Sequence, residues 1–201
     1  MYRLLESIRI FNGVVQHPDI HFKRMERALG KSKLPLNETA FLDLFTAFDT
    51  TKATVVKARL LYDENGFSIN FEPYTKRKIN SLVLRHGDHI SYSVKYADRS
   101  QINGLMQDLD PESDVLILQN GMVTDTSYCN VAFYNGSDWY TPTKPLLNGI
   151  QRQFLLQSKL VKKRNIKASD IQNYSKIRLF NAMMPWEEAL ELDIEQGCIE
   201  M

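Results

Sequence analysis

The chain has 201 residues, of which 43% are hydrophobic and 24% are charged, a composition typical of a folded domain and not of a disordered chain. Its 25 basic and 24 acidic residues give a net charge of +1, so no overall charge attracts it to nucleic acid or to an anionic membrane. The two cysteines, Cys129 and Cys198, are too few for a disulfide framework or a cysteine-rich zinc site. We therefore expect a small-molecule substrate and no bound metal.

The opening residues Met-Tyr-Arg-Leu-Leu-Glu lack the apolar core of a signal peptide. No apolar run along the chain approaches the ~20 residues that a membrane-spanning helix requires. The basic runs 76–78 and 162–164 are interpreted as part of a linker and as the end of a helix, where cations favour the helix dipole. We therefore expect a cytoplasmic protein that binds neither membrane nor nucleic acid.

Residues 1–74 are predicted to form an N-terminal α+β lobe. It begins with a short hairpin over 7–15, because Asn12 and Gly13 can supply the positive φ angles of a tight turn. Apolar periodicity then predicts a helix over 19–29 that Asp19 caps and Gly30 ends, a helix over 37–48, and a hairpin over 54–71. The segment 73–78 breaks the pattern and carries charge, so it is the expected linker between lobes.

Residues 75–201 are predicted to form a C-terminal α+β lobe. Its expected strands are 81–84, 90–99, 114–118, 122–134, 139–140 and 177–180. Its expected helices are 99–109, 150–163 and a short one that starts at Pro185, since proline is tolerated in a first turn. This mixture of antiparallel strands and segregated helices is typical of an α+β fold and not of a doubly wound parallel sheet.

Two residues on the predicted strands, Asp125 and Lys95, differ in the burial that the pattern predicts for them. Alternation over 122–134 places Asp125 on the same side as Val123 and Val131, where an ionised carboxylate without a partner costs several kcal/mol. A cationic partner is therefore expected there, and the alternative is an aspartate at a bulge that faces water. Alternation over 90–99 places Lys95 with serines, which by itself indicates a solvated lysine.

The order of several short segments changes the interpretation of Lys95. The segments are His21-Phe-Lys-Arg24, the stretch around Lys95, Gln119–Asn130, Tyr140-Thr-Pro142 and Leu147-Asn-Gly-Ile-Gln-Arg152. In that order they resemble the class IV aminotransferase family, the pyridoxal-phosphate enzymes of fold type IV. The resemblance implies a two-lobed α+β fold like that of D-amino acid aminotransferase, with the cofactor between the lobes. It also implies that Lys95 is catalytic and carries the cofactor as a Schiff base.

The same resemblance implies how the cofactor, pyridoxal 5'-phosphate, is held. Arg24 matches the family arginine that grips the phosphate, and a planar guanidinium suits bidentate contact with an anion. The backbone amides of Gly149 and Ile150 match a second phosphate contact at a helix N-terminus. Asp125 matches a position that usually bears glutamate, which keeps the ring nitrogen protonated. Gln151 replaces a common threonine, so one hydroxyl contact is lost.

Two further segments resemble the 4-amino-4-deoxychorismate lyases of this family. They are Phe180-Asn-Ala-Met-Met-Pro185, and Lys95 followed four residues later by Arg99. The resemblance implies that Asn181 and Ala182 contact the cofactor. It also offers Arg99 and Asn181 as substrate contacts. Arg59 is a further candidate for a substrate carboxylate, because it lies in an apolar strand of the first lobe. For Arg59 the alternative is a structural ion pair with Glu6 or Asp63, and for Asn181 it is the cap of a turn.

The expected reaction is therefore release of pyruvate from 4-amino-4-deoxychorismate, which gives 4-aminobenzoate. The first alternative is a branched-chain or D-amino acid aminotransferase, and the second is an inactive cofactor-binding relative. Family members usually begin with a further strand and loop before the Glu-x-x-Arg segment at Glu6. We accordingly expect either a more open pocket or one that a partner subunit closes, and we expect a homodimer.

Overall fold

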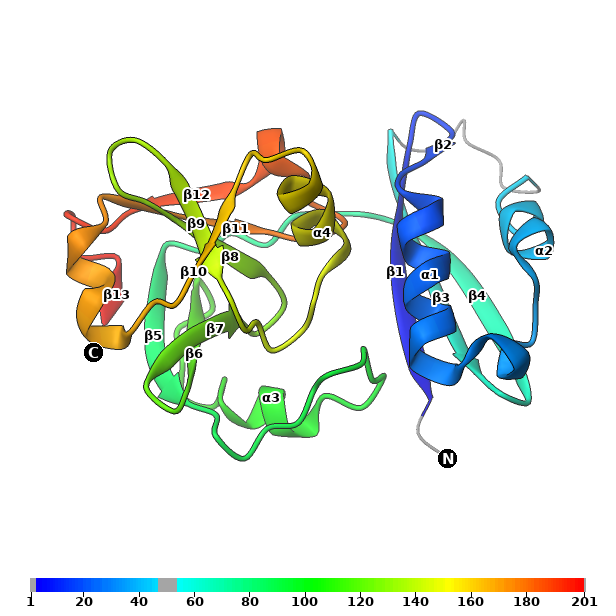
Figure 1. The fold of residues 1–201 in the computed structure, drawn as a ribbon, viewed down its shortest axis with the longest axis horizontal. Helices are drawn as coiled ribbons and strands as arrows, with labels where there is room; N and C mark the ends of the chain where they lie inside the picture. The colour runs from blue at the N-terminus through cyan, green and yellow to red at the C-terminus, as the bar shows by residue number, and fades with distance from the viewer. Residues whose placement is uncertain (1–2, 47–53, 201) are drawn as a thin grey trace. The chain divides into compact units, whose positions relative to one another are not determined.

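The computed structural model of the chain describes residues 3–46 and 54–200 (Figure 1). They group into two compact units, Met1–Thr75 with Val94–Asp98, and Lys76–Ser93 with Arg99–Met201. The division after residue 75 lies one residue from the predicted one, but the segment that contains Lys95 groups with the first unit. Backbone hydrogen bonds explain this difference, since Leu5 N donates to Lys95 O and Ala97 N donates to Arg3 O, both at 2.9 Å.

The first unit is built on a four-stranded antiparallel sheet with the strand order β2-β1-β3-β4. Its strands are β1 (Leu4–Phe11), β2 (Val14–Val15), β3 (Val55–Asp63) and β4 (Gly66–Pro73). Both predicted hairpins are confirmed. Asn12 and Gly13 join β1 to β2 with φ angles of 47° and 81°, as a two-residue turn of this kind requires.

Two α-helices and one 3-10 helix follow the first hairpin. They are α1 (Pro18–Leu29), η1 (Lys31–Lys33) and α2 (Glu38–Asp43). Helix α1 ends at Gly30 as predicted, but the residue before its first turn is His17, so the prediction that Asp19 caps it is wrong. Asn37 caps α2 by accepting a hydrogen bond from Ala40 N at 2.9 Å. The predicted helix over 37–48 is shorter than expected, and residues 47–48 lie outside the described residues.

One face of this sheet packs against α1 and forms the apolar core of the unit (Figure 1). Ile8 of β1 lies opposite Ala58 of β3, and both side chains are fully buried against Met25 of α1. Glu6 lies opposite Leu60 in the same register. Because side chains two residues apart share a face, the Glu6 carboxylate enters this apolar layer beneath α1.

The second unit contains a nine-stranded sheet. Its main path runs β10-β9-β8-β7-β6-β5-β13, and β11 pairs with β8 and β12 outside that path. The strands are β5 (Ser81–His86), β6 (Ser113–Gln119), β7 (Met122–Thr126), β8 (Asn130–Tyr134), β9 (Trp139–Pro142), β10 (Lys162–Arg164), β11 (Lys176–Phe180), β12 (Leu190–Asp193) and β13 (Ile199–Glu200). The helices are α3 (Ser100–Gly104), α4 (Ile150–Gln157), η3 (Ala168–Asn173) and η4 (Trp186–Glu188). The mixed sheet with few helices confirms the predicted α+β class.

Two predicted strands are wrong in form. Residues 90–99 form no regular strand and make one isolated bridge, from Tyr96 to Leu4. The predicted strand 122–134 divides into β7 and β8 with a bend at Ser127–Cys129, so alternation does not run through it. The bend lets β8 fold back on β7, where Asn130 lies opposite Asp125.

Helix α4 ends six residues before the predicted end of its helix at residue 163. Lys159 adopts a left-handed φ of 59°, and Leu160 N donates to Leu155 O at 3.0 Å, the closing bond of a Schellman motif. Residues 162–164 then form β10, which pairs in parallel with β9. The interpretation of this basic run as a helix end is therefore wrong. The predicted helix over 99–109 is likewise reduced to α3 followed by turns.

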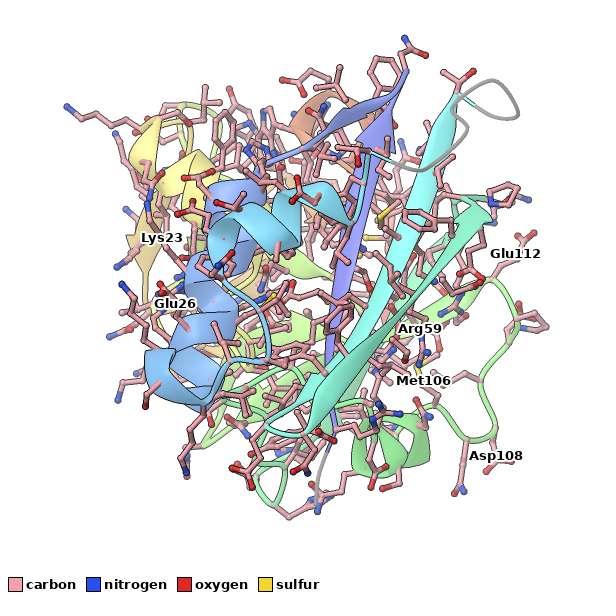
Figure 2. The ribbon with its side chains drawn as sticks, turned by 90° about the vertical axis from the view of Figure 1, so that its right-hand side faces the viewer. Lys23, Glu26, Arg59, Met106, Asp108 and Glu112 are labelled. Carbon is pink, nitrogen blue, oxygen red and sulfur yellow. The ribbon has the colours of Figure 1, made fainter. Side chains whose placement is uncertain are left out.

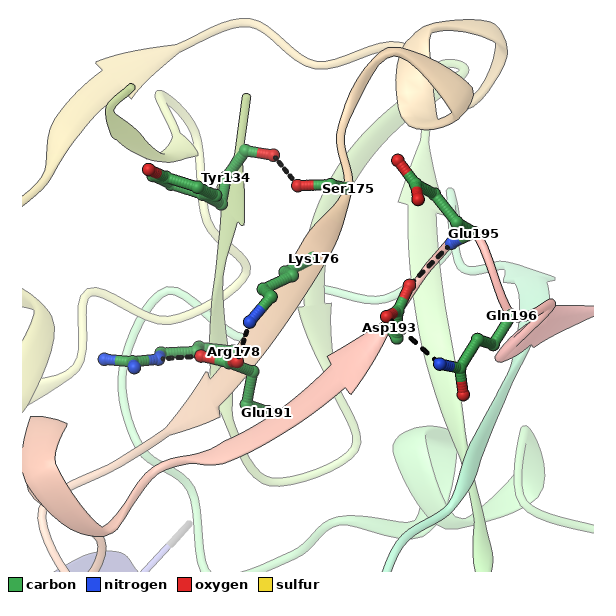
Figure 3. Close-up of polar contacts among 8 residues, drawn as sticks. All are labelled: Tyr134, Ser175, Lys176, Arg178, Glu191, Asp193, Glu195 and Gln196. Atoms are coloured by element: carbon green, nitrogen blue, oxygen red, sulfur yellow. Dashed lines mark hydrogen bonds and ion pairs between the residues drawn. The ribbon is translucent and has the colours of Figure 1, made fainter. Parts of the chain in front are cut away.

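Charged and aromatic side chains join β11 to β12 and η4. Lys176 and Arg178 both donate to Glu191, at 2.6 Å and 2.8 Å, and Figure 3 shows them converging on its carboxylate. The Arg178 guanidinium also lies over the rings of Trp139 and Trp186, at 4.8 Å and 4.6 Å from their centroids. These contacts fix the strand that leads into the turn at Asn181. Among the described residues, no helix has the length and apolar character needed to span a membrane.

Candidate active site

In the first unit, Arg24 is part of a buried charged cluster. Its Nε donates to Glu6 Oε1 at 2.8 Å and its Nη2 donates to Glu6 Oε2 at 2.5 Å. His21, three residues earlier on α1, contacts Glu6 Oε2 through Nδ1 at 2.5 Å. The side chains of Glu6 and His21 are fully buried, whereas that of Arg24 keeps 11% of its surface exposed.

The pKa values of this cluster follow from burial and charge together. Burial alone would raise the pKa of Glu6, but Arg24 and His21 outweigh it and hold that pKa at about 2. Burial lowers the pKa of His21, and the hydrogen bond to Glu6 opposes this effect only in part. Glu6 is therefore ionised and accepts only, so Nδ1 of a neutral His21 carries the proton that it donates.

Lys95 and Arg59 both belong to the first unit. Lys95 is half-buried and lies beside β1, where its carbonyl accepts a hydrogen bond from Leu5 N at 2.9 Å. Arg59 of β3 alternates with the core residues Ala58 and Leu60 and is half-buried (Figure 2). The ion pairs once expected for Arg59 are made by other residues, since Glu6 binds His21 and Arg24 and Asp63 binds Arg3 at 3.6 Å.

In the second unit, Asp125 of β7 lies in a buried cradle of neutral hydrogen-bond donors. Asn130 Nδ2 donates to its Oδ1 at 2.7 Å, and Leu147 N donates to its Oδ2 at 2.8 Å. The alternative of an aspartate that faces water is wrong, because the side chain is buried. Burial raises the pKa of Asp125 to about 7, against the lowering effects of these hydrogen bonds and of the Arg152 charge.

The N-terminus of α4 adjoins this cradle through Asn130. The same Asn130 amide also donates to Leu147 O at 2.9 Å, which fixes the loop before Gly149. A Cβ atom on Gly149 would lie 2.0 Å from Asn130 Oδ1, so only glycine fits here. The structure thus brings the predicted residues Gly149 and Ile150 next to Asp125. The buried Arg152 donates to Asn148 Oδ1 at 2.8 Å and stiffens the first turn of the helix.

The remaining predicted residues meet at the bend between β7 and β8. Arg99 donates from Nη2 to Ser127 O, and Asn181 donates from Nδ2 to Tyr128 O at 3.3 Å. Asn181 Oδ1 also accepts from Met183 N at 2.8 Å, so it caps the turn that contains the half-buried Ala182. The turn-capping alternative for Asn181 is therefore confirmed, while its role toward a ligand stays a prediction.

The sequence interpretation missed four residues that hold the predicted ones in place: Glu6, His21, Asn130 and Arg152. Asn130 and Arg152 close two of the segments that carry the family resemblance, and Glu6 lies at the start of the Glu-x-x-Arg segment. A signal was therefore present for each, but their partners are distant in sequence. Among the described residues, no group of histidine, cysteine or carboxylate side chains could hold a metal ion.

Comparison with known proteins identifies the family of the chain. Residues 3–190 match the family described as amino-transferase class IV. An uncharacterised protein of Haemophilus influenzae is 36% identical over 188 residues, which cover 91% of this chain and 98% of that protein. The crystal structure of a proposed 4-amino-4-deoxychorismate lyase from Haemophilus somnus is 31% identical, with a TM-score of 0.80, and the match covers 92% of this chain and 98% of that one.

A second solved structure, a proposed amino-acid aminotransferase from Mesorhizobium loti, shares the fold with a TM-score of 0.82 at 18% identity. The match covers 96% of this chain and 99% of that chain. A related fold from Mycobacterium tuberculosis, a hypothetical aminotransferase, is known in a form with bound pyridoxal phosphate. The chain thus belongs to the class IV aminotransferase family and is a pyridoxal-phosphate-dependent enzyme.

Proposed function

We propose that this enzyme is a 4-amino-4-deoxychorismate lyase, which releases pyruvate from its substrate and leaves 4-aminobenzoate. The observation that carries the proposal is the convergence of Arg99 and Asn181 on the bend Ser127–Cys129, beside the Asp125 cradle. These two residues belong to the segments that resemble the lyases. They place the Arg99 guanidinium, a hydrogen-bond donor, and the Asn181 amide near the residue proposed to bind the cofactor ring. The likeness to the Haemophilus somnus protein, itself a proposed lyase, supports the same assignment.

The residues present fit pyridoxal phosphate. Asp125 is a buried carboxylate whose two hydrogen-bond donors are neutral, so a protonated ring nitrogen would supply the charge that stabilises its ionised form. The first turn of α4 offers free backbone amides to a phosphate, at the positive end of the helix dipole. By the family resemblance, Arg24 is a further proposed phosphate contact, of the charge-assisted kind.

In the proposed reaction each protein group has a separate task. Pyridoxal phosphate, when bound, supplies an electron-withdrawing ring that stabilises negative charge beside the substrate amine. Lys95 Nζ removes the proton from the ring carbon that bears the amine. The bond between the ring and the enolpyruvyl oxygen then breaks as the electron pair of the C–H bond forms the ring double bond, and Lys95 returns its proton to the methylene carbon of the departing enolpyruvate, which gives pyruvate. Asp125 keeps the ring nitrogen of the cofactor protonated throughout.

The substrate carries one carboxylate on its ring and one on the enolpyruvyl group, so the proposal requires cationic or amide donors. Arg59 and Arg99 are the cationic donors that we propose for them, whereas the two N–H groups of the Asn181 amide already donate to Tyr128 O and Cys129 Sγ. A transaminase of hydrophobic amino acids would instead need an apolar surface and a 2-oxo acid acceptor. The donors near Asp125 therefore favour the lyase over the aminotransferase.

The test is turnover of aminodeoxychorismate as the sole substrate. We expect equal amounts of 4-aminobenzoate and pyruvate with no 2-oxo acid present, and we expect borohydride to fix the cofactor on Lys95. Lys95→Ala should abolish both, whereas Lys78→Ala, which removes an exposed partner of Glu112, should change neither. If turnover requires an amino donor and a 2-oxo acid together, the enzyme is an aminotransferase. If the cofactor binds without either reaction, it is an inactive relative.

A further inference from the structure

We propose that Glu6 and His21 are positioning residues, which fix the plane of the Arg24 guanidinium and so preset its free N–H groups for the cofactor phosphate. The proposal rests on the proposed phosphate contact of Arg24 and adds the device that orients it. No contact between Glu6 or His21 and the cofactor is required.

The geometry of the Arg24–Glu6 pair defines one edge of the guanidinium. Two parallel hydrogen bonds, Nε to Oε1 at 2.8 Å and Nη2 to Oε2 at 2.5 Å, hold guanidinium and carboxylate in a common plane. A guanidinium has five N–H groups, and these bonds use two of them. The three others belong to Nη1 and to the outer side of Nη2. Neither of the two bonds to Glu6 uses them.

The Glu6 side chain is itself fixed by its neighbours on the sheet and by His21. It lies on the core face of β1 opposite Leu60, with Leu4 and Ile8 as its neighbours on that face. His21 Nδ1 donates to Oε2 and leaves the carboxylate no freedom to rotate away from Arg24. The pKa of about 2 keeps Glu6 charged at any pH at which the enzyme works. Rotation of Arg24 would therefore leave a buried carboxylate short of a partner.

A structural role alone does not account for this cluster. Buried ion pairs add little to stability compared with apolar residues of the same size, and α1 already covers the sheet with Phe22 and Met25. The Arg24 side chain also retains 11% of its surface, so it is not sealed from solvent as Glu6 and His21 are. An arginine whose orientation is fixed before binding loses less conformational freedom when it takes an anion.

The test compares binding of pyridoxal phosphate with binding of pyridoxal, which lacks the phosphate. In the intact protein we expect Glu6→Gln to weaken pyridoxal phosphate at least about tenfold, because it removes a charge-assisted bond that orients Arg24. Its affinity for pyridoxal should stay within about twofold, because that ligand makes no phosphate contact. The matched control is Asp19→Asn, which removes a carboxylate from an exposed ion pair with Lys23 on the same helix. It should change neither affinity.

Further variants separate positioning from folding. His21→Asn retains a donor near Nδ1 and should keep the preference for pyridoxal phosphate, whereas His21→Leu should reduce it. In an Arg24→Gln background, Glu6→Gln should cause no additional loss. If Glu6→Gln fails to fold, the proposal is tested with the two His21 variants, by measuring their affinities for pyridoxal phosphate and for pyridoxal.

Four results would overturn the proposal. Equal weakening of both ligands by Glu6→Gln, or an additional loss in the Arg24→Gln background, would show a structural role only. If the unmodified protein prefers pyridoxal phosphate, and Arg24→Gln removes that preference but Glu6→Gln does not, this inference fails while the proposed phosphate contact stands. If the unmodified protein shows no preference between the two ligands, the phosphate contact itself fails and takes this inference with it.

Discussion

Glu6 and Asp125 are both carboxylates in the interior of a unit, and they differ in what surrounds them. Glu6 has a guanidinium and an imidazole as partners, and its pKa falls to about 2. Asp125 has an amide and a backbone N–H as hydrogen-bond donors, and burial raises its pKa to about 7. Cationic partners within the protein compensate the negative charge of Glu6. The charge of Asp125 is compensated only when the carboxylate binds a cation or takes up a proton.

This difference in partners distinguishes a residue that orients a neighbouring side chain from a residue that binds a ligand. A carboxylate that already has two close partners cannot exchange them for a ligand without leaving a buried charge unpaired. A carboxylate with neutral donors gains most when a protonated ring nitrogen arrives, because the new charge favours its ionised form. We therefore assign ligand binding to Asp125 and orientation of Arg24 to Glu6.

The largest expected effect concerns stability in the absence of cofactor. Glu6→Gln should lower the free energy of unfolding by about 3–5 kcal/mol, because it leaves a guanidinium with a buried, uncharged partner. Asp125→Asn should lower it less, by about 1–2 kcal/mol, because it removes no ion pair but turns an amide N–H toward a donor that a carboxylate oxygen now accepts from. Urea unfolding measures both. The exposed control Asp19→Asn should change the free energy of unfolding by no more than about 0.5 kcal/mol. Equal losses of stability at Glu6 and Asp125 would contradict the distinction between the two carboxylates.

The pH dependence of stability should have opposite signs at the two carboxylates. The native state retains the Asp125 proton up to about pH 7, so its contribution to stability falls as the pH rises from about 4 to about 7, by at most about 4 kcal/mol. The Glu6 contribution is lost as the pH falls from about 4.5 through about 2. Unfolding curves of each variant, subtracted from those of the unmodified protein, give these slopes, and slopes of the same sign would contradict us.

A smaller effect is expected from filling the space beside Asn130. Gly149→Ala places a Cβ atom 2.0 Å from Asn130 Oδ1 and should cost about 1–3 kcal/mol while it displaces the amide from Asp125. Gly104→Ala in α3 is the matched control, because a Cβ atom there meets open space. That control should be neutral or stabilising by up to about 1 kcal/mol. Thermal unfolding measures the stability of both variants. Equal changes in stability would show that the site beside Asn130 can accommodate a Cβ atom.

The sequence was most informative where structure is decided locally. The turn residues Asn12-Gly13 define the first hairpin, and the stripe of apolar residues before Gly30 defines α1. Helix α4 was predicted too long because its Schellman motif uses Lys159 in the left-handed conformation, where glycine is the usual signal. The stretch around Lys95 was predicted as a strand of the second lobe because its pairing with β1 joins residues far apart in the chain.

The same limit applies to the candidate site. The resemblance of short motifs pointed to Arg24, Asp125 and Gly149, but gave no partner for any of them. Glu6 lies 18 residues from Arg24, and Leu147 lies 22 residues from Asp125. These partners decide whether each group is satisfied within the protein or requires a ligand. That property depends on burial and three-dimensional contacts, which the sequence pattern did not contain.

The most direct test of the account is a titration of the carboxyl carbons of Asp125 and Glu6 by carbon-13 NMR, with and without pyridoxal phosphate. We predict that Asp125 titrates near pH 7 in the free protein and below about pH 5 when the cofactor is bound, because a protonated ring nitrogen favours its ionised form. Glu6 should stay ionised down to about pH 2 in both states. An Asp125 that titrates near pH 4 in the free protein, or that does not respond to the cofactor, would contradict the assignment of ligand binding to this residue.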